Sequence, residues 1–237
     1  MYSGASPTEN PYKREMVMNA KLAAVQSEFY YVLSMGWHLP TEELAAEVAS
    51  GAFRQHMLEL IETAREMNDA EDDWDEALLQ MHEIWKEASA AEEFHGLRIE
   101  YTRLFSTPKK SVHRLYEALA RGKSKMLFEN PVAKHAEDCY RRAGLRIEHR
   151  QQEPADYLPT ELEFASVLLT ELATELTGED KTLPISQKEC AALWQEFYQE
   201  HLAGWLAEFW QAVAADTTSE CYRRLALTGA VLLKKEW

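Results

Sequence analysis

Apolar residues recur three or four positions apart over most of this sequence, which is the spacing of one face of an α-helix. In residues 19–37, for example, Leu22, Val25 and Phe29 fall at that spacing. No stretch alternates between apolar and polar residues for long enough to predict a strand. Nine glycines and eight prolines among 237 residues leave few interruptions. The sequence therefore predicts an all-α fold of about ten helices.

Capping residues and helix breakers predict where several helices begin and end. Asn130 followed by proline is typical of a helix N-terminus. Ser186 with Glu189 three residues later has the spacing of a capping box, and it opens what we expect to be the longest helix, ending near Ala215. Further expected boundaries are Thr41, the stop at Gly51, and a last N-cap at Thr217 or Thr218.

We expect a single helical bundle-like unit, in which an arm precedes two helical sets joined by a connector. The predicted ranges are a flexible arm at 1–17, an N-terminal helical set at 18–144, a connector or hinge loop at 145–160, and a C-terminal helical set at 161–237. Prolines at 154 and 159 favour extended backbone and then a helix start in the connector. We expect its polar groups, Glu153, Asp156 and Tyr157, to face a neighbour or a groove.

Acidic residues dominate the charge of the chain, with 40 Asp and Glu against 25 Lys and Arg, a formal net charge of −15. Such a surface repels phosphate backbones, so nucleic acid is a poor partner. It attracts cationic segments and speeds their encounter. The alternative is that the acidity only keeps a helical protein in solution.

The three cysteines, Cys139, Cys190 and Cys221, lie far apart and suggest reduced thiols rather than a disulfide framework. The polar start at Met1–Asn10 does not have the pattern of a secretory signal. The apolar run Leu225–Leu233 is too short to span a bilayer. We therefore expect a cytoplasmic protein without stable membrane insertion.

Residue patterns for catalysis or metal binding are sparse. Glu92 and His95 make one Glu-x-x-His pair, but a dinuclear site needs a second, so both are expected on a solvated helix face. His201 lies inside a predicted helix, where a single histidine is more often packed than catalytic. Zinc-protease, serine-hydrolase and phosphate-loop motifs are missing. The sequence predicts no enzyme, no metal and no cofactor.

Aromatic residues are numerous, with seven tryptophans and ten tyrosines. Trp194, Phe197, Trp205, Phe209 and Trp210 are spaced so that they cannot all point the same way from one helix. Two interpretations stay open: packing in the core or a dimer, or an apolar groove that receives a peptide.

Three blocks of the sequence, in order, resemble the TorD/DmsD/NarJ family of redox enzyme maturation chaperones. The first is Glu100-Tyr101-Thr102-Arg103-Leu104-Phe105 with Pro108 and Ser111-Val112; the second is Glu153-Pro154-Ala155-Asp156-Tyr157-Leu158 followed by Glu161-Leu162-Glu163-Phe164; the third is Phe197 to Phe209 with His201, Leu202 and Trp205. The resemblance covers roughly residues 20–215. Two departures are Tyr157, where the family usually has histidine, and a short 105–111 loop without the family's tryptophan.

The resemblance implies a cytoplasmic chaperone for a molybdopterin-dependent oxidoreductase. It would bind the twin-arginine signal peptide of the precursor and delay export until the cofactor is inserted. Glu153 and Asp156 would lie near the arginines, because carboxylates pair with guanidinium groups directionally. The other residues expected in the peptide site are Tyr101, Leu104, Phe105, Pro108, Tyr157, Glu161, Phe164, His201 and Trp205.

Two other functions are compatible with the same residues. A scaffolding subunit would bind the mature reductase without recognising a leader, and a metal-dependent hydrolase would carry bound metal. The identity of the reductase, binding of a nucleotide, and the choice between a monomer and a domain-swapped homodimer stay open.

Overall fold

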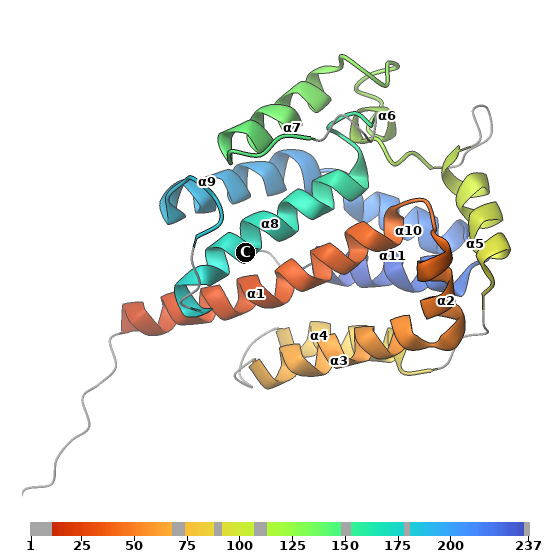
Figure 1. Cartoon of the computed structure of the whole chain (residues 1–237), viewed down its shortest axis with the longest axis horizontal. Coiled ribbons are helices and arrows are strands. Elements are labelled where there is room, and N and C mark those ends of the chain that lie inside the picture. Colours follow the sequence, from red (N-terminus) through yellow and green to blue (C-terminus); the bar gives the residue numbers. More distant parts are fainter. Residues whose placement is uncertain are drawn as a thin grey trace, which may run out of the picture.

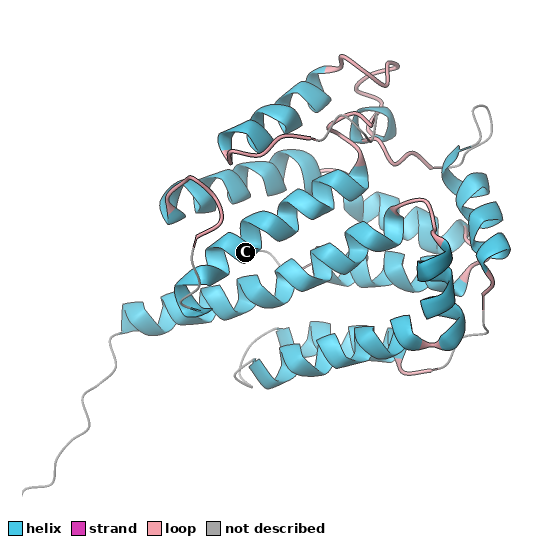
Figure 2. Cartoon of the chain, in the orientation of Figure 1, coloured by secondary structure: helices cyan, strands magenta, loops and turns pink. Residues whose placement is uncertain are grey.

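The computed structural model describes residues 11–67, 74–87, 92–106, 113–147, 153–177 and 181–234. Eleven α-helices and two short π-helical segments make up this part of the chain, which contains no strand (Figure 2). The helices are α1 (Pro11–Trp37), α2 (Glu42–Ser50), α3 (Ala52–Met67), α4 (Trp74–Trp85), α5 (Phe94–Tyr101), α6 (Glu117–Ala120), α7 (Pro131–Arg142), α8 (Leu158–Thr177), α9 (Gln187–Phe197), α10 (Leu206–Asp216) and α11 (Glu220–Leu232). The π-helical segments are η1 (Thr102–Ser106) and η2 (Tyr198–Leu202). The all-α prediction is confirmed.

Helices α1 and α8 form the centre of the molecule and lie side by side along much of their length (Figure 1). The pair is fixed at one end by Ser34, whose hydroxyl donates to the carbonyl of Pro159 at 2.8 Å. The α3–α4 hairpin covers one side of α1, and α7 lies on the opposite side of the molecule (Figure 1). Because α1 and α8 come from the two predicted helical sets, the sets share one core rather than packing separately.

Aromatic side chains fill that core instead of lining a surface. Trp37 is fully buried, and its ring stacks on Trp210 with centroids 5.0 Å apart. Phe105 and Phe209 meet the same indole edge-on at 5.8 and 5.9 Å. The five aromatic residues singled out on the predicted long helix are also buried, so they contribute to core packing.

Several predicted helix boundaries are confirmed. Asn130 caps α7, with its side-chain oxygen accepting from the amide of Ala133. Ser186 and Glu189 form the expected capping box at the start of α9. The cap at Thr41 and the left-handed stop at Gly51 are also present.

Three boundary predictions are wrong. Helix α1 begins at Pro11, so residues 11–17 are helical rather than part of an arm; residues 1–10 lie outside the described part. The expected long helix after Ser186 is interrupted by η2 and by a turn before α10, and α1 is longer than either half. The last helix is capped by Ser219 rather than by a threonine, because the Ser219 hydroxyl reaches the amide of Tyr222.

Close packing at Gly229 gives a testable prediction for stability. A methyl group there would lie 2.6 Å from the ring of Trp210, which is buried and has no room to move. We expect Gly229→Ala to cost about 1–3 kcal/mol, the usual penalty for overpacking. Gly96, in α5, has open space around it, so Gly96→Ala should stabilise by about 0.5–1 kcal/mol through helix propensity. Urea unfolding of both variants tests this prediction. Equal changes in the free energy of unfolding, both of the same sign, would contradict it.

Candidate functional site

The connector is held in place by a buried carboxylate. Asp156 is fully buried, and its Oδ2 accepts from the amide of Ala118 at 3.0 Å and from the side-chain amide of Asn130 at 3.4 Å. Its backbone carbonyl also accepts from the amide of Glu117 at 2.9 Å. Burial raises the pKa of Asp156. Asp156 therefore satisfies the first amides of α6, as an N-terminal capping carboxylate does.

The next residue, Tyr157, is buried as well. Its backbone pairs with Tyr116 in an isolated antiparallel bridge, and its hydroxyl lies 3.2 Å from that of Tyr101. Tyr116 in turn donates its hydroxyl proton to Glu153 at 2.8 Å. Asp156 and Tyr157 thus face neighbouring segments of the same chain and not a groove, whereas Glu153 is half-buried and reaches a cavity.

The predicted peptide-site residues do not gather on one surface. Glu153 lines a large cavity beside α7, Phe164 an adjoining one, and His201 and Trp205 two further ones. Pro108 lies outside the described residues, as do residues 148–152 of the connector. The remaining predicted residues are buried and line none of these four cavities: Tyr101, Leu104, Phe105, Asp156, Tyr157 and Glu161.

The first sequence block clamps the turn between α10 and α11. Arg103 donates twice to the carboxylate of Glu100, at 2.7 and 2.8 Å, and once to the carbonyl of Asp216 at 2.7 Å. The same carboxylate accepts from the Thr217 hydroxyl at 3.0 Å and the Thr218 amide at 2.6 Å. These bonds, led by those from Arg103, outweigh burial and lower the pKa of Glu100 to about 2.

This clamp predicts an acid-sensitive contribution to stability. The folded state holds the Glu100 proton less tightly than the unfolded state, whose pKa is near 4.5. The contribution is therefore complete above pH 4.5 and lost as the pH falls toward 2. We expect the stability difference between wild type and Glu100→Gln, measured by urea unfolding, to be smaller at pH 3 than at pH 7. An equal difference at both pH values would contradict the assignment, and the exposed Glu93→Gln serves as the control.

A buried charge network joins α6, α8 and η2. His201 donates from Nδ1 to Glu117 at 2.6 Å, and the Glu161 carboxylate lies 3.6 Å from the same nitrogen. Arg121 pairs with Glu117 and donates to the carbonyl of Glu200. Glu117 and Glu161 are fully buried, and His201 is nearly so. The network ties three elements that are distant in sequence.

The pKa values in this network move in opposite directions. Burial acts to raise the pKa of Glu117, but hydrogen bonds from His201 and Arg121 outweigh it and lower the pKa. Burial raises the pKa of Glu161 well above its usual range. Burial acts to lower the pKa of His201, but its interactions with Cys139, Glu117 and Glu161 raise the pKa to about 11. One carboxylate is therefore charged beside an imidazolium while the other holds its proton.

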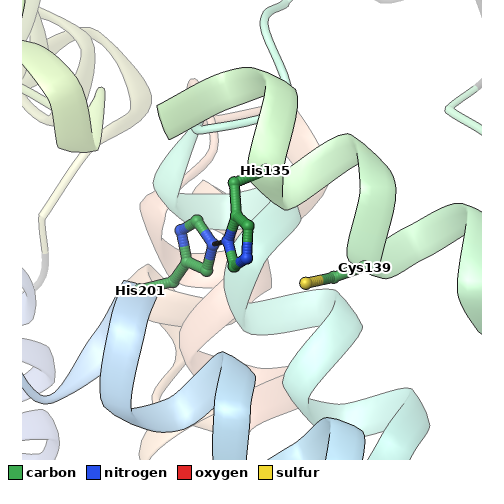
Figure 3. A group of neighbouring side chains, drawn as sticks. All are labelled: His135, Cys139 and His201. Carbon is green, nitrogen blue, oxygen red and sulfur yellow. Dashed lines mark hydrogen bonds between the residues drawn. The ribbon is translucent and has the colours of Figure 1, made fainter. Parts of the chain in front are cut away.

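The network continues to α7 through a pair of imidazole rings. His135 Nδ1 lies 2.8 Å from His201 Nε2, and the two rings stack 5.0 Å apart (Figure 3). The thiol of Cys139, one turn further along α7, points toward the two imidazole rings (Figure 3). His135 also lies 3.4 Å from Glu196, which forms a two-bonded ion pair with Arg142.

The largest of these cavities, which we call the α7 groove, lies between α7 and the connector and has a volume of about 1220 Å³. Its apolar lining is Phe128, Ala133, Tyr140, Leu145, Ile147, Pro154 and Ala155. Its charged lining is Glu129, Lys134, Glu137, Arg141, Arg146 and Glu153. An adjoining cavity of about 360 Å³ shares Tyr140, Leu145 and Ile147 and extends the surface to Phe164.

Sequence reasoning missed most residues of the α7 groove and of the charge network. The spacing of His135 and Cys139, four apart on one helix, was a visible signal. Glu117 has one local partner, Arg121, but the two that make it part of the buried network, Glu161 and His201, are 44 and 84 residues away. The position of His201 depends on η2, a π-helical turn of the kind that is common at functional sites.

Glu92 and His95 do not share the solvated helix face that was expected, because Glu92 is half-buried and precedes α5. Glu92 accepts from the amide of Cys221 at 2.8 Å, at the start of α11, while the side chain of His95 is exposed. Among the described helices, none is long and apolar enough to cross a membrane.

Comparison with known protein families gives a match over most of the chain. The family model described as the nitrate reductase delta subunit matches residues 65–211, which is more than half of the chain and includes all three sequence blocks. No curated protein and no solved structure matches the chain significantly. The match agrees with the TorD/DmsD/NarJ resemblance of the sequence and with the all-α fold. The chain belongs to the nitrate reductase delta subunit family, a family of NarJ/TorD-type chaperones for molybdoenzyme assembly.

Proposed function

We propose that this protein is a cytoplasmic chaperone that binds the twin-arginine signal peptide of a molybdopterin-dependent oxidoreductase precursor. Binding delays export of the precursor until the cofactor is inserted. The family match over residues 65–211 is the observation that carries the proposal. The protein acts by binding and not as an enzyme.

The α7 groove is the proposed site for the leader. A twin-arginine leader has a cationic start and an apolar segment behind it, so its site needs carboxylates beside an apolar surface. Three of the six charged positions of the groove are acidic, Glu129, Glu137 and Glu153, and its apolar lining includes Phe128 and Ile147. Carboxylates pair with guanidinium groups in a directional, two-bonded geometry.

The long-range charge of the chain favours the same partner. A net charge of −15 attracts a cationic leader before contact and speeds association, more so at low ionic strength. Glu153 is the residue that links this site to the second sequence block. Asp156 is buried and already bonded to α6, so we place it beneath the site as a support for the connector.

A pair of variants in one loop tests the location of the site. Phe128 and Met126 are 53% and 60% exposed, but only Phe128 lines the α7 groove. We expect Phe128→Ser to weaken leader binding about tenfold or more, the loss of roughly 1.4 kcal/mol of apolar contact. Met126→Ser should leave the affinity unchanged. Calorimetric titration with the leader peptide measures both, and equal effects of the two variants would remove the groove from the site.

A further inference from the structure

We propose that His135, Cys139 and His201 form a binding site for a divalent transition metal ion of the zinc class. His135 and Cys139 are four residues apart and lie on one face of α7, and His201 approaches from η2 (Figure 3). Their three ligand atoms all lie within 4.8 Å of one another. Metal–nitrogen and metal–sulfur bonds are about 2.0–2.3 Å long. Three ligand atoms this close together therefore need only small side-chain movements to surround one ion.

The ring of His201 is already oriented for a metal. Its Nδ1 donates to Glu117 at 2.6 Å, which directs Nε2 toward His135 and Cys139. A carboxylate behind a metal-binding histidine is the usual arrangement that fixes the ring and raises its basicity. Glu161 is buried beside the same ring, with its carboxyl group 3.6 Å from Nδ1.

The charges around the site favour a cation on the His135 side of His201. The charged carboxylate of Glu117 lies behind the ring, and Glu196 of α9 lies 3.4 Å from His135. A second possible group, made of Glu117, Glu161 and His201, shares the ring but lies beside the guanidinium of Arg121. That positive charge disfavours a metal there. The thiol further selects a transition metal over calcium or magnesium.

The ion has a route from solvent. A cavity of about 370 Å³ opens beside His135 and His201, and the side chain of His135 is 42% exposed. The cavity leaves room for water as a fourth ligand. None of the three proposed ligands lines the α7 groove, so the site is separate from the proposed leader site.

Metal binding exchanges protons for the ion. Two metal–nitrogen bonds and one metal–sulfur bond form, while the thiol proton of Cys139 and the proton held between the two imidazole rings leave to solvent. No oxidation or reduction is involved. Because protons compete with the ion, the affinity rises with pH.

Titration of the full chain with cobalt(II), followed by absorption, tests the proposal. We expect one equivalent to bind and to give the thiolate-to-cobalt charge-transfer band. Cys139→Ala should abolish the band, and His135→Gln should weaken binding at least tenfold. Cys190→Ala, which removes another buried thiol, should leave the spectrum unchanged. Calorimetry with zinc in two buffers of different protonation enthalpy should show proton release.

Three spectroscopic results would each overturn the site: no charge-transfer band with the wild-type chain, a band that persists in Cys139→Ala, or an equal loss of the band in Cys190→Ala. His135→Gln keeps the test decisive if Cys139→Ala does not fold, because His135 is partly exposed and its replacement disturbs little packing. Unchanged cobalt affinity in His135→Gln would also overturn the proposal. None of these metal titrations measures leader binding, so their outcome is independent of the proposed function.

Discussion

Replacing Glu117 by alanine is expected to lower the free energy of unfolding by about 3–5 kcal/mol, the usual cost of breaking a buried ion pair from one side. Glu117 is fully buried and accepts from both His201 and Arg121. Without it, the imidazolium and the guanidinium lose their buried counter-charge. Urea unfolding of the variant measures the loss.

The matched control for that variant is Glu196→Ala. Glu196 also contacts a histidine and an arginine, but its side chain is 35% exposed, so we expect a change of no more than about 1 kcal/mol. Glu117→Gln keeps one acceptor oxygen, so its loss of stability should fall between the losses of the two alanine variants. A loss in Glu117→Ala no larger than that in Glu196→Ala would contradict the account of the network.

Replacing Trp37 by alanine is the second change with a large expected effect, about 3–5 kcal/mol of stability. Trp37 has no exposed surface and packs against Trp210, Phe105, Phe209 and Tyr222 with ring centroids 5.0–6.0 Å apart. Its removal leaves a cavity among rings that belong to η1, α10 and α11. These rings are fixed by one another, so the cavity does not collapse.

Tyr31, in the same helix, provides the control. Its side chain is 48% exposed, so Tyr31→Ala is expected to change stability by less than about 0.5 kcal/mol. Thermal unfolding of both variants measures the contrast. Similar losses of stability in the two variants would mean that the aromatic residues do not form the core described around Trp37.

Features that depend on neighbouring residues were predictable from the sequence. The caps at Asn130 and at Ser186 with Glu189 are examples, because the side chain and the amide that it satisfies are three residues apart. The helical periodicity likewise gave the all-α class and most helices. The predicted continuous helix after Ser186 was wrong because the break at η2 comes with long-range contacts, such as that of His201 with Glu117.

The position of the acidic groups in the connector could not be predicted locally. Asp156 and Glu153 are both acids in one short loop, yet the first is buried and the second reaches a cavity. The difference arises from α6, whose amide at Ala118 lies 38 residues earlier in the chain and needs an acceptor. The same reason applies to the aromatic residues, since periodicity does not say whether a ring enters the core or a groove.

The most direct test of the proposed function is calorimetric titration of the purified protein with twin-arginine leader peptides from candidate reductases, at low and moderate salt. We predict that one leader binds with micromolar or tighter affinity, and that binding weakens with salt and on replacing both arginines of the peptide. The absence of binding to any leader, with the mature reductase still retained by the protein on a column, would contradict the account and indicate a scaffold.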